Sequence, residues 1–268
     1  IVIKGSNSLD EYAQVDTFVF DKTGTLTTGV PKIQRIIAYE GYDDEEVLRI
    51  AACLEEHFYH PIATAVVKKA EDEGIEHEEM HGKLTHVASK GIVSSIDGKR
   101  VVIGSLELLE DEKTIISNEQ KAVIEEYSQK YNLLYLSYDG KLIAIFLIDT
   151  PLRGEAIALL KELKEKGKQI VLLTGDTQKR TETICSLIPF DRVYTQVKPE
   201  QKHQVIEQLQ EEGHHVLMIG DGINDSAALS LANVGIVMAG ASDIARQASD
   251  ILFLNEQLTG LEVLENIT

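Results

Sequence analysis

Residues 15–27 decide the fold, because the apolar run VDTFVF (15–20) leads directly into DKTGTLT (21–27). The apolar run predicts a buried strand, and open parallel sheets place their active sites beyond the carboxyl ends of the strands. The turn that follows is rich in threonine and glycine and offers backbone N–H groups that can surround a phosphate. We therefore predict that Asp21 is a nucleophile that becomes an aspartyl phosphate.

Short apolar runs alternate with amphipathic segments from about residue 145 onward. Helices are predicted at 154–166 and 200–212, where apolar side chains recur at helical spacing. Strands are predicted at 169–174, 193–194, 216–219, 234–238 and 251–254. Alternating strands and helices imply a parallel sheet with right-handed crossovers, and the strand before Asp21 belongs to it. The chain is therefore expected to have an α/β fold with a doubly wound parallel sheet.

The block between residues 30 and 143 has a different pattern. It contains three predicted helices, at 43–57, 61–73 and 117–131, and five short predicted strands, at 84–87, 92–96, 100–103, 133–138 and 141–147. Asp97-Gly98 and Asp139-Gly140 are typical of hairpin turns. We therefore expect two domains: residues 1–29 and 144–268 form the first, and residues 30–143 form an inserted α+β domain with an antiparallel sheet.

Carboxylates at a second strand end predict a magnesium site. Asp221 and Asp225 lie in the segment GDGIND (220–225), after a predicted strand. Because Mg²⁺ in proteins uses one or two carboxylates together with phosphate oxygens and water, we expect Asp21 and Asp221 to be ligands, helped by the carbonyl of Thr23. Asp225 is expected to orient the loop or a metal-bound water. Taken alone, this segment could also be an ordinary acidic loop.

Further groups suited to phosphate follow in two other segments. Thr174, Gly175 and Asp176 end another predicted strand, where a hydroxyl and backbone N–H groups can hold phosphate oxygens. Lys202 can supply a point charge for the phosphoryl group. A single Thr-Gly-Asp is usually a turn and a single lysine is usually at the surface, so the argument depends on all these segments occurring together.

Taken together and in this order, the segments resemble the catalytic region of P-type ATPases, which are ion pumps built on a haloacid-dehalogenase-like, Rossmann-type domain. The resemblance implies ATP and Mg²⁺ as cofactors. Residues 149–153, DTPLR, resemble the hinge motif of the pumps and imply that Arg153 is a cation on the nucleotide side, although Asp149 and Arg153 could also cap a helix. Simple phosphatases of this superfamily carry a second aspartate two residues after the nucleophile. Here Thr23 takes that place, and its lack of an acid–base group favours a long-lived phosphoenzyme.

Within the pumps, the resemblance is to the branch that transports heavy metals. His60-Pro61, with Glu55 five residues earlier, matches the nucleotide-binding motif of that branch, which implies that the insert is a nucleotide-binding domain. The family's Gly-x-Gly occurs here as Ser89-Lys90-Gly91, and Gly104 matches a later glycine. Phe58-Tyr59 replaces the Ser-Glu pair of the family. The two glycines are expected to leave room for the purine.

Several histidines have spacings that invite a metal site. His57 and His60, and likewise His77 and His81, are three and four residues apart. Pro61 interrupts the helical context of the first pair, and the second pair lies in a glutamate-rich loop. Exposed surface is therefore the better interpretation for His77, His81 and His86.

The bulk composition limits the possible partners. The net charge of −18 argues against nucleic acid and against an anionic membrane surface. Two distant cysteines, Cys53 and Cys185, indicate a reducing compartment. No apolar run is long enough to span a membrane, and the start at Ile1 without methionine indicates a piece of a larger protein.

The resemblance implies that this piece lies at the cytoplasmic face of a membrane, with membrane and actuator domains of the same pump as partners. The transported transition-metal ion would bind in the absent membrane domain, and copper, zinc, cadmium and manganese all remain open. Two other functions are kept as alternatives: a free-standing phosphatase of the same fold, and a nucleotide-sensing domain without catalysis. Failure to form a phosphoenzyme would favour the second alternative.

Overall fold

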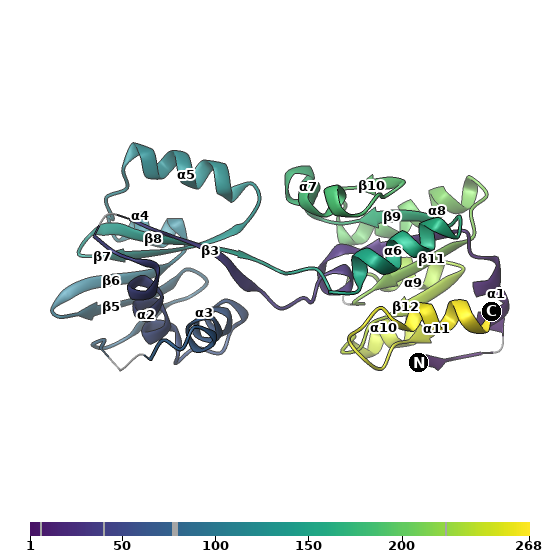
Figure 1. Ribbon diagram of the computed structural model, residues 1–268, viewed down its shortest axis with the longest axis horizontal. Helices are drawn as coiled ribbons and strands as arrows, with labels where there is room; N and C mark the ends of the chain where they lie inside the picture. The colour runs from purple at the N-terminus through teal and green to yellow at the C-terminus, as the bar shows by residue number, and fades with distance from the viewer. Residues whose placement is uncertain (6, 40, 77–79, 223) are drawn as a thin grey trace. The chain divides into compact units, whose positions relative to one another are not determined.

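The structure is a computed structural model that describes residues 1–5, 7–39, 41–76, 80–222 and 224–268. The chain forms two compact units, and Figure 1 labels the helices and strands that each contains. Unit 1 consists of Ile1–Gly29 and Pro151–Thr268, and unit 2 consists of Val30–Thr150. Where the chain leaves unit 1 and returns to it, Thr27 and Leu152 form an antiparallel bridge, and the N–H of Thr28 donates to the carbonyl of Pro151 at 3.0 Å. These contacts connect the turn after Asp21 to the segment by which the chain returns to unit 1.

Unit 1 is built on a seven-stranded sheet with the strand order β1-β13-β12-β11-β2-β9-β10. The strands are β1 (Val2–Ile3), β2 (Thr17–Asp21), β9 (Gln169–Leu173), β10 (Arg192–Tyr194), β11 (Val216–Gly220), β12 (Val234–Val237) and β13 (Ile251–Leu252). All neighbouring pairs are parallel except the edge pair β1–β13. The predicted parallel sheet is confirmed.

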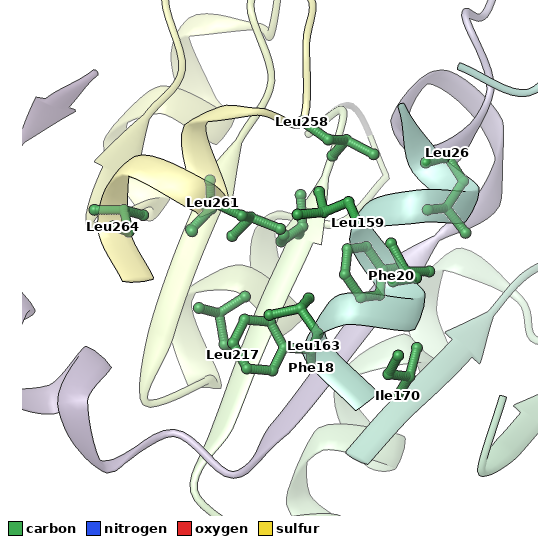
Figure 2. Close-up of a cluster of buried hydrophobic side chains, with 14 of the residues drawn as sticks. Phe18, Phe20, Leu26, Leu159, Leu163, Ile170, Leu217, Leu258, Leu261 and Leu264 are labelled. Carbon is green, nitrogen blue, oxygen red and sulfur yellow. The ribbon is translucent and has the colours of Figure 1, made fainter. Parts of the chain in front are cut away.

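Helices cover both faces of this sheet. Successive side chains of a strand point to opposite faces, so the apolar residues of each strand need cover on both. In β2, Phe18 and Phe20 belong to one buried cluster and Val19 belongs to the other. Figure 2 shows the first cluster, in which Phe18 and Phe20 lie among leucines of the covering helices. The first face carries α1 (Asn7–Gln14), α6 (Ala156–Glu165), α7 (Gln178–Leu187) and α11 (Gly260–Ile267), and the second carries α8 (Lys202–Glu211), α9 (Ser226–Leu231) and α10 (Asp243–Ala248). Burial of each phenylalanine ring contributes about 1.5–3 kcal/mol.

Unit 2 is built on a six-stranded antiparallel sheet with the order β3-β8-β7-β6-β5-β4. Its strands are β3 (Lys32–Ala38), β4 (Thr85–Val87), β5 (Gly91–Ile96), β6 (Lys99–Gly104), β7 (Asn132–Tyr138) and β8 (Lys141–Asp149). The helices α2 (Asp44–Glu55) and α3 (Pro61–Asp72) pack on one face, while α4 (Leu106–Asp111) and α5 (Asn118–Ser128) pack on the other. The predicted antiparallel sheet is confirmed.

Local signals in unit 2 explain where several elements begin and turn. Asp97 and Gly98 both have positive φ, as do Asp139 and Gly140, which matches the tight hairpin turns that their sequences predict. At α5, the side chain of Ser117 accepts from the N–H of Gln120, whose side chain accepts from the N–H of Ser117. This reciprocal pair satisfies two backbone donors that the first turn of a helix leaves open.

The structure differs from the sequence prediction in three places in unit 2, one of which is the short helix α4, which was not predicted. The predicted return to the first domain at residue 144 falls inside β8, which continues to Asp149, and unit 2 ends at Thr150. β3 was not predicted, although it pairs with β8 at the edge of the sheet. The differences at β8 and β3 have one cause, since the last residues of β8 are held by β3, which lies more than a hundred residues earlier in the chain.

Candidate active site

The carboxyl ends of three neighbouring strands of unit 1 bring the predicted phosphoryl-transfer residues together. β9, β2 and β11 are adjacent and parallel, and Asp21 at the end of β2 is in register with Leu173 of β9. Thr174 follows β9 directly, and Asp221 follows β11 directly. Lys202 comes from the first turn of α8. Segments up to 200 residues apart in sequence therefore meet at one edge of the sheet.

A buried lysine between two buried carboxylates forms the centre of the site. The Nζ of Lys202 lies 2.9 Å from Oδ1 of Asp21 and 2.7 Å from Oδ1 of Asp225. The relative exposure is 6% for Lys202, 7% for Asp21 and 1% for Asp225. Burial and the negative charge of Asp225 raise the pKa of Asp21 to about 7, although Lys202 opposes this. Burial also works against the charge of Lys202, but the two carboxylates outweigh it and raise the pKa of the lysine.

The same edge of the sheet has the donor set for a divalent cation. One carboxylate oxygen from each of Asp21, Asp221 and Asp225 lies within 4.8 Å of the others. Asp225 Oδ2 is buried and has no hydrogen-bond partner in the part of the chain that the structure describes. Clustered carboxylates with such an orphaned oxygen fit Mg²⁺, which prefers oxygen ligands. Thr23 is exposed at the start of the turn, with φ −76° and ψ 128°.

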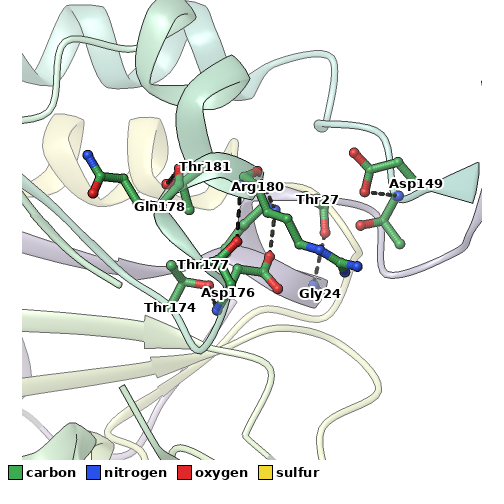
Figure 3. A network of polar contacts seen from close by, with 11 residues as sticks. Gly24, Thr27, Asp149, Thr174, Asp176, Thr177, Gln178, Arg180 and Thr181 are labelled. Atoms are coloured by element: carbon green, nitrogen blue, oxygen red, sulfur yellow. Dashed lines mark hydrogen bonds and ion pairs between the residues drawn. The ribbon is translucent and has the colours of Figure 1, made fainter. Parts of the chain in front are cut away.

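Gly24 is required by the close approach of the two candidate ligand segments. It has φ of +76°, and a Cβ at this position would lie 2.8 Å from Oδ2 of Asp221. Any larger residue would strain the backbone and push the Asp221 carboxylate away. Its N–H donates to Oγ1 of Thr27 at 3.1 Å, which fixes the turn (Figure 3). The glycine of the DKTGT motif thus lets the turn lie against the second carboxylate.

Some polar groups of the segment after β9 are hydrogen-bonded or ion-paired to other groups of the protein (Figure 3). Thr174 is buried, and its Oγ1 accepts from the N–H of Asp176 at 3.1 Å. The carboxylate of Asp176 forms an ion pair with Nζ of Lys22 at 2.6 Å. Gly175 has room for a Cβ at ordinary contact distance from the carbonyl of Val197.

The ion pair gives Asp176 a positioning role that the sequence analysis missed. Lys22 also donates to the carbonyl of Arg180 at 3.3 Å, and it is 7% exposed. It therefore joins the turn that carries Asp21 to the start of α7. The only signal in the sequence was the position of Lys22 directly beside the nucleophile.

Arg153 contacts a different set of groups from the one we expected. Its Nε donates to the carbonyl of Thr25 at 2.7 Å, one terminal nitrogen donates to the carbonyl of Gly24 at 3.0 Å, and the other donates to the carbonyl of Glu256. The residue is 8% exposed. The guanidinium group is buried and holds the backbone of the nucleophile's turn, and its expected role as a nucleotide-side cation stays a prediction.

Glu55 and His60 lie side by side in unit 2, at the end of α2 and the start of α3. Nε2 of His60 is 3.6 Å from Oε2 of Glu55. Nδ1 of His60 accepts from the N–H of Ala63 at 3.2 Å and so caps α3. Glu55 is 2% exposed, and its Oε2 accepts no hydrogen bond within the described residues. Burial raises the pKa of Glu55 to about 7, and burial together with His86 lowers the pKa of His60.

Gly91 and Gly104 face each other across β5 and β6. A Cβ on Gly91 would lie 2.1 Å from the carbonyl oxygen of Ile103, and one on Gly104 would lie 2.2 Å from that of Lys90. The absence of a side chain at both glycines therefore allows the backbones of β5 and β6 to approach each other closely. Ser89, which stands where the family has glycine, has φ of +61°. That conformation favours glycine, so the departure from the family pattern strains the backbone locally.

A family model described as haloacid dehalogenase-like hydrolase matches residues 15–233, which include the site carboxylates and Lys202. The chain belongs to the haloacid dehalogenase-like hydrolase family. Within this family, it is 36% identical over 262 residues to a silver exporting P-type ATPase of Salmonella typhimurium, covering 96% of this chain and 31% of the relative. Other relatives are named as copper-, zinc- and manganese-exporting P-type ATPases. The chain spans about a third of the length of the curated relatives it matches.

Solved structures show the same relationship. A zinc-transporting PIB-type ATPase in an E2.Pi state has a TM-score of 0.88 and 27% identity, covering 99% of this chain and 43% of that one. The catalytic domain of the CPx-ATPase CopB-B, described for its conformational changes upon nucleotide binding, has a TM-score of 0.74 and 30% identity, covering 98% of this chain and 94% of that domain. The resemblance to heavy-metal P-type ATPases is confirmed. No helix in the described ranges is long and apolar enough to cross a membrane.

Proposed function

We propose that this chain is the catalytic unit of a heavy-metal P-type ATPase, in which unit 2 binds ATP and Asp21 accepts its γ-phosphoryl group. The observation that carries the proposal is the placement of Asp21 at a strand end, with Lys202 at 2.9 Å and Asp221 and Asp225 beside it. This arrangement surrounds a nucleophilic carboxylate with the charges that phosphoryl transfer requires.

In the proposed reaction, a carboxylate oxygen of Asp21 attacks the γ-phosphorus in line with the bond to the bridging oxygen, which breaks as ADP leaves. Lys202 favours the ionised form of Asp21, and its ammonium group faces the oxygens of the transferred phosphoryl group. Asp225 holds Lys202 in place through the 2.7 Å contact. Mg²⁺, held by Asp21, Asp221 and the carbonyl of Thr23, would neutralise charge on the phosphate oxygens. Thr174 and the N–H of Gly175 are the proposed donors to those oxygens.

Water then cleaves the aspartyl phosphate and restores Asp21. The position two residues after the nucleophile holds Thr23, whose hydroxyl is no general base at neutral pH. A positioned acid–base group contributes about 10²–10⁴ in rate, so its absence supports slow hydrolysis. A long-lived phosphoenzyme is what a pump needs to couple chemistry to movement of other domains.

For the nucleotide, we propose that Glu55 accepts from the adenine amino group and that the ring of His60 lies against the base. The buried Oε2 of Glu55, which lacks a donor among the described residues, supports this role. For Gly91 and Gly104, we propose only that their backbones line the purine site. The close contact between their strands already requires that both positions lack a side chain.

The whole protein is proposed to export a transition-metal ion through a membrane domain, with an actuator domain as a further partner and this unit at the cytoplasmic face. Relatives named for silver, copper, zinc and manganese support the class of ion without selecting one.

The experiment compares two phosphoryl donors on the same variants. His60→Asn keeps a side chain that can cap α3 and removes the ring, and Glu55→Ala removes the acceptor for the adenine amino group. Both are expected to weaken ATP binding by about 1–3 kcal/mol, while phosphorylation by acetyl phosphate, which has no base, is retained. Tyr59→Ala, at a side chain 98% exposed, is the matched control. Equal loss with both donors would show that His60 and Glu55 only support the fold.

A further inference from the structure

Three potential metal ligands meet at a second place, in unit 2. Glu56 and His57 directly follow α2, and His81 lies in the segment that precedes β4. One ligand atom from each of these residues lies within 4.8 Å of the others. This group, here called the His57 cluster, joins His57 to His81, which are 24 residues apart. Neither of the helix-like histidine pairs in the sequence predicted it, and His77 lies outside the described residues.

The backbones on both sides of the His57 cluster are held in place without any ligand. His81 forms an antiparallel bridge with Ile96, and the N–H of Gly82 donates to the carbonyl of Ser95 at 2.8 Å. The N–H of Met80 donates to Sγ of Cys53 in α2 at 3.4 Å. The cluster is therefore a feature of the fold, because packing of α2 against the end of β5 brings its two halves together.

The atoms within the cluster are arranged in a way that suits a metal ion. Nε2 of His57 lies 3.3 Å from Oε1 of Glu56, and adjacent ligands of a tetrahedral zinc ion, at 2.0–2.2 Å from the metal, are about 3.3–3.5 Å apart. Nδ1 of His81 lies 2.7 Å from the carbonyl oxygen of Gly82, which can only accept. This contact selects the tautomer with the proton on Nδ1 and the lone pair on Nε2, as in many metal-binding histidines.

The rings of His57 and His81 also lie close to each other. Their centroids are 5.3 Å apart and the rings are nearly perpendicular. The side chain of His57 is 44% exposed and that of Glu56 is 27% exposed. Both side chains therefore have room to adjust toward a bound ion, and water can reach that ion.

We propose that the His57 cluster binds a divalent transition-metal ion of borderline softness, such as Zn²⁺, through two imidazoles and one carboxylate, with water in the remaining position. This ligand set suits Zn²⁺ better than Mg²⁺, which takes oxygen ligands, or Cu⁺, which takes thiolates and thioethers. The bound ion would join the end of α2 to the segment docked on β5. The proposal does not depend on phosphoryl transfer, since all its ligands lie in unit 2.

The test is isothermal titration of the full chain with Zn²⁺ in the presence of excess Mg²⁺, which is added to compete for the carboxylates of unit 1. Glu56→Gln, His57→Ala and His81→Gln are each expected to lower the Zn²⁺ affinity by at least about tenfold. His86→Ala, which removes a ring stacked on Phe58 outside the cluster, and Asp221→Asn are expected to leave that affinity unchanged. Thermal denaturation without metal checks that each variant folds.

A spectroscopic probe distinguishes this site from scattered surface binding. Co²⁺ bound by the wild-type chain should show the intense visible absorption of a four-coordinate ion, and this absorption should be lost in His57→Ala and in His81→Gln. Zn²⁺ binding that is unchanged in all three cluster variants, or Co²⁺ spectra typical of six-coordinate hydrated ions, would overturn the proposal.

Discussion

Replacing Lys202 with methionine removes one buried charge while keeping an unbranched apolar stem of nearly the same length. The lysine lies 2.9 Å from Asp21 and 2.7 Å from Asp225, and all three residues are less than 10% exposed. Without the ammonium group, two carboxylates remain buried next to each other. Removing one partner of a buried ion pair costs about 3–5 kcal/mol. Because Asp21 can take up a proton, we expect the lower end, about 3 kcal/mol at pH 8.

The pH dependence distinguishes this electrostatic cost from lost packing. The pKa of Asp21, already raised to about 7, rises further in Lys202→Met, since the charge that lowers it is gone. A carboxyl group whose folded pKa exceeds its unfolded value destabilises the folded state above that unfolded value, and stability returns as the pH falls and the group binds a proton. Because wild-type Asp21 itself binds a proton below about pH 7, the destabilisation should be about 1.4 kcal/mol smaller at pH 5 than at pH 8.

The assay is thermal and denaturant unfolding of the full chain in EDTA at pH 5 and pH 8. A loss of about 3 kcal/mol corresponds to a drop of roughly 6–12 °C in the melting temperature of unit 1. Lys161→Met, at an exposed position of α6, is the control. A destabilisation of equal size at both pH values would refute the electrostatic account and indicate packing of the lysine stem.

Three further substitutions test other parts of the structure. Arg153→Lys keeps the charge but loses the guanidinium group that holds the carbonyls of the nucleophile's turn. The phosphorylation rate should therefore fall about tenfold or more, while ATP affinity stays within about twofold. A selective loss of ATP affinity would instead support a role of Arg153 on the nucleotide side. Glu55→Gln removes a carboxyl group whose pKa is raised from 4.5 to about 7. Between pH 5 and pH 8.5, the wild type should therefore lose about 3 kcal/mol of stability relative to this variant. If the free energy of unfolding of the two proteins changed with pH in the same way, the raised pKa would be contradicted. Ser89→Gly relieves a positive φ and should raise stability by about 0.5 kcal/mol in urea unfolding; a loss would show that the serine side chain has its own contacts.

Local patterns were enough to predict the architecture and the centre of the site. The apolar run before Asp21, the alternation after residue 145 and the hairpin turns at Asp97 and Asp139 each depend on neighbouring residues. Such signals predict strands and turns reliably, and parallel topology then requires Asp21 and Asp221 to lie at the same edge.

The side-chain contacts that were missed join segments that are distant in the sequence. Lys22 pairs with Asp176, 154 residues later, and no spacing rule connects them. The role of Arg153 depends on the carbonyl of Glu256, 103 residues away. The His57 cluster was missed because spacing arguments pair residues on one helix, whereas His81 is positioned by the end of β5. Packing determines these contacts, and the sequence carries no local signal for packing.

The central claim is that Asp21 carries the phosphoryl group, and mapping that group tests it most directly. The chain is incubated with radiolabelled ATP and Mg²⁺, quenched in acid, and reduced with borohydride, which converts an acyl phosphate to an alcohol and marks the modified residue for mass spectrometry. We predict an acid-stable, hydroxylamine-labile label, with the reduced residue at position 21, and no label in a folded Asp21→Asn variant. A label that persists in Asp21→Asn, or maps to another residue, would contradict the proposed function.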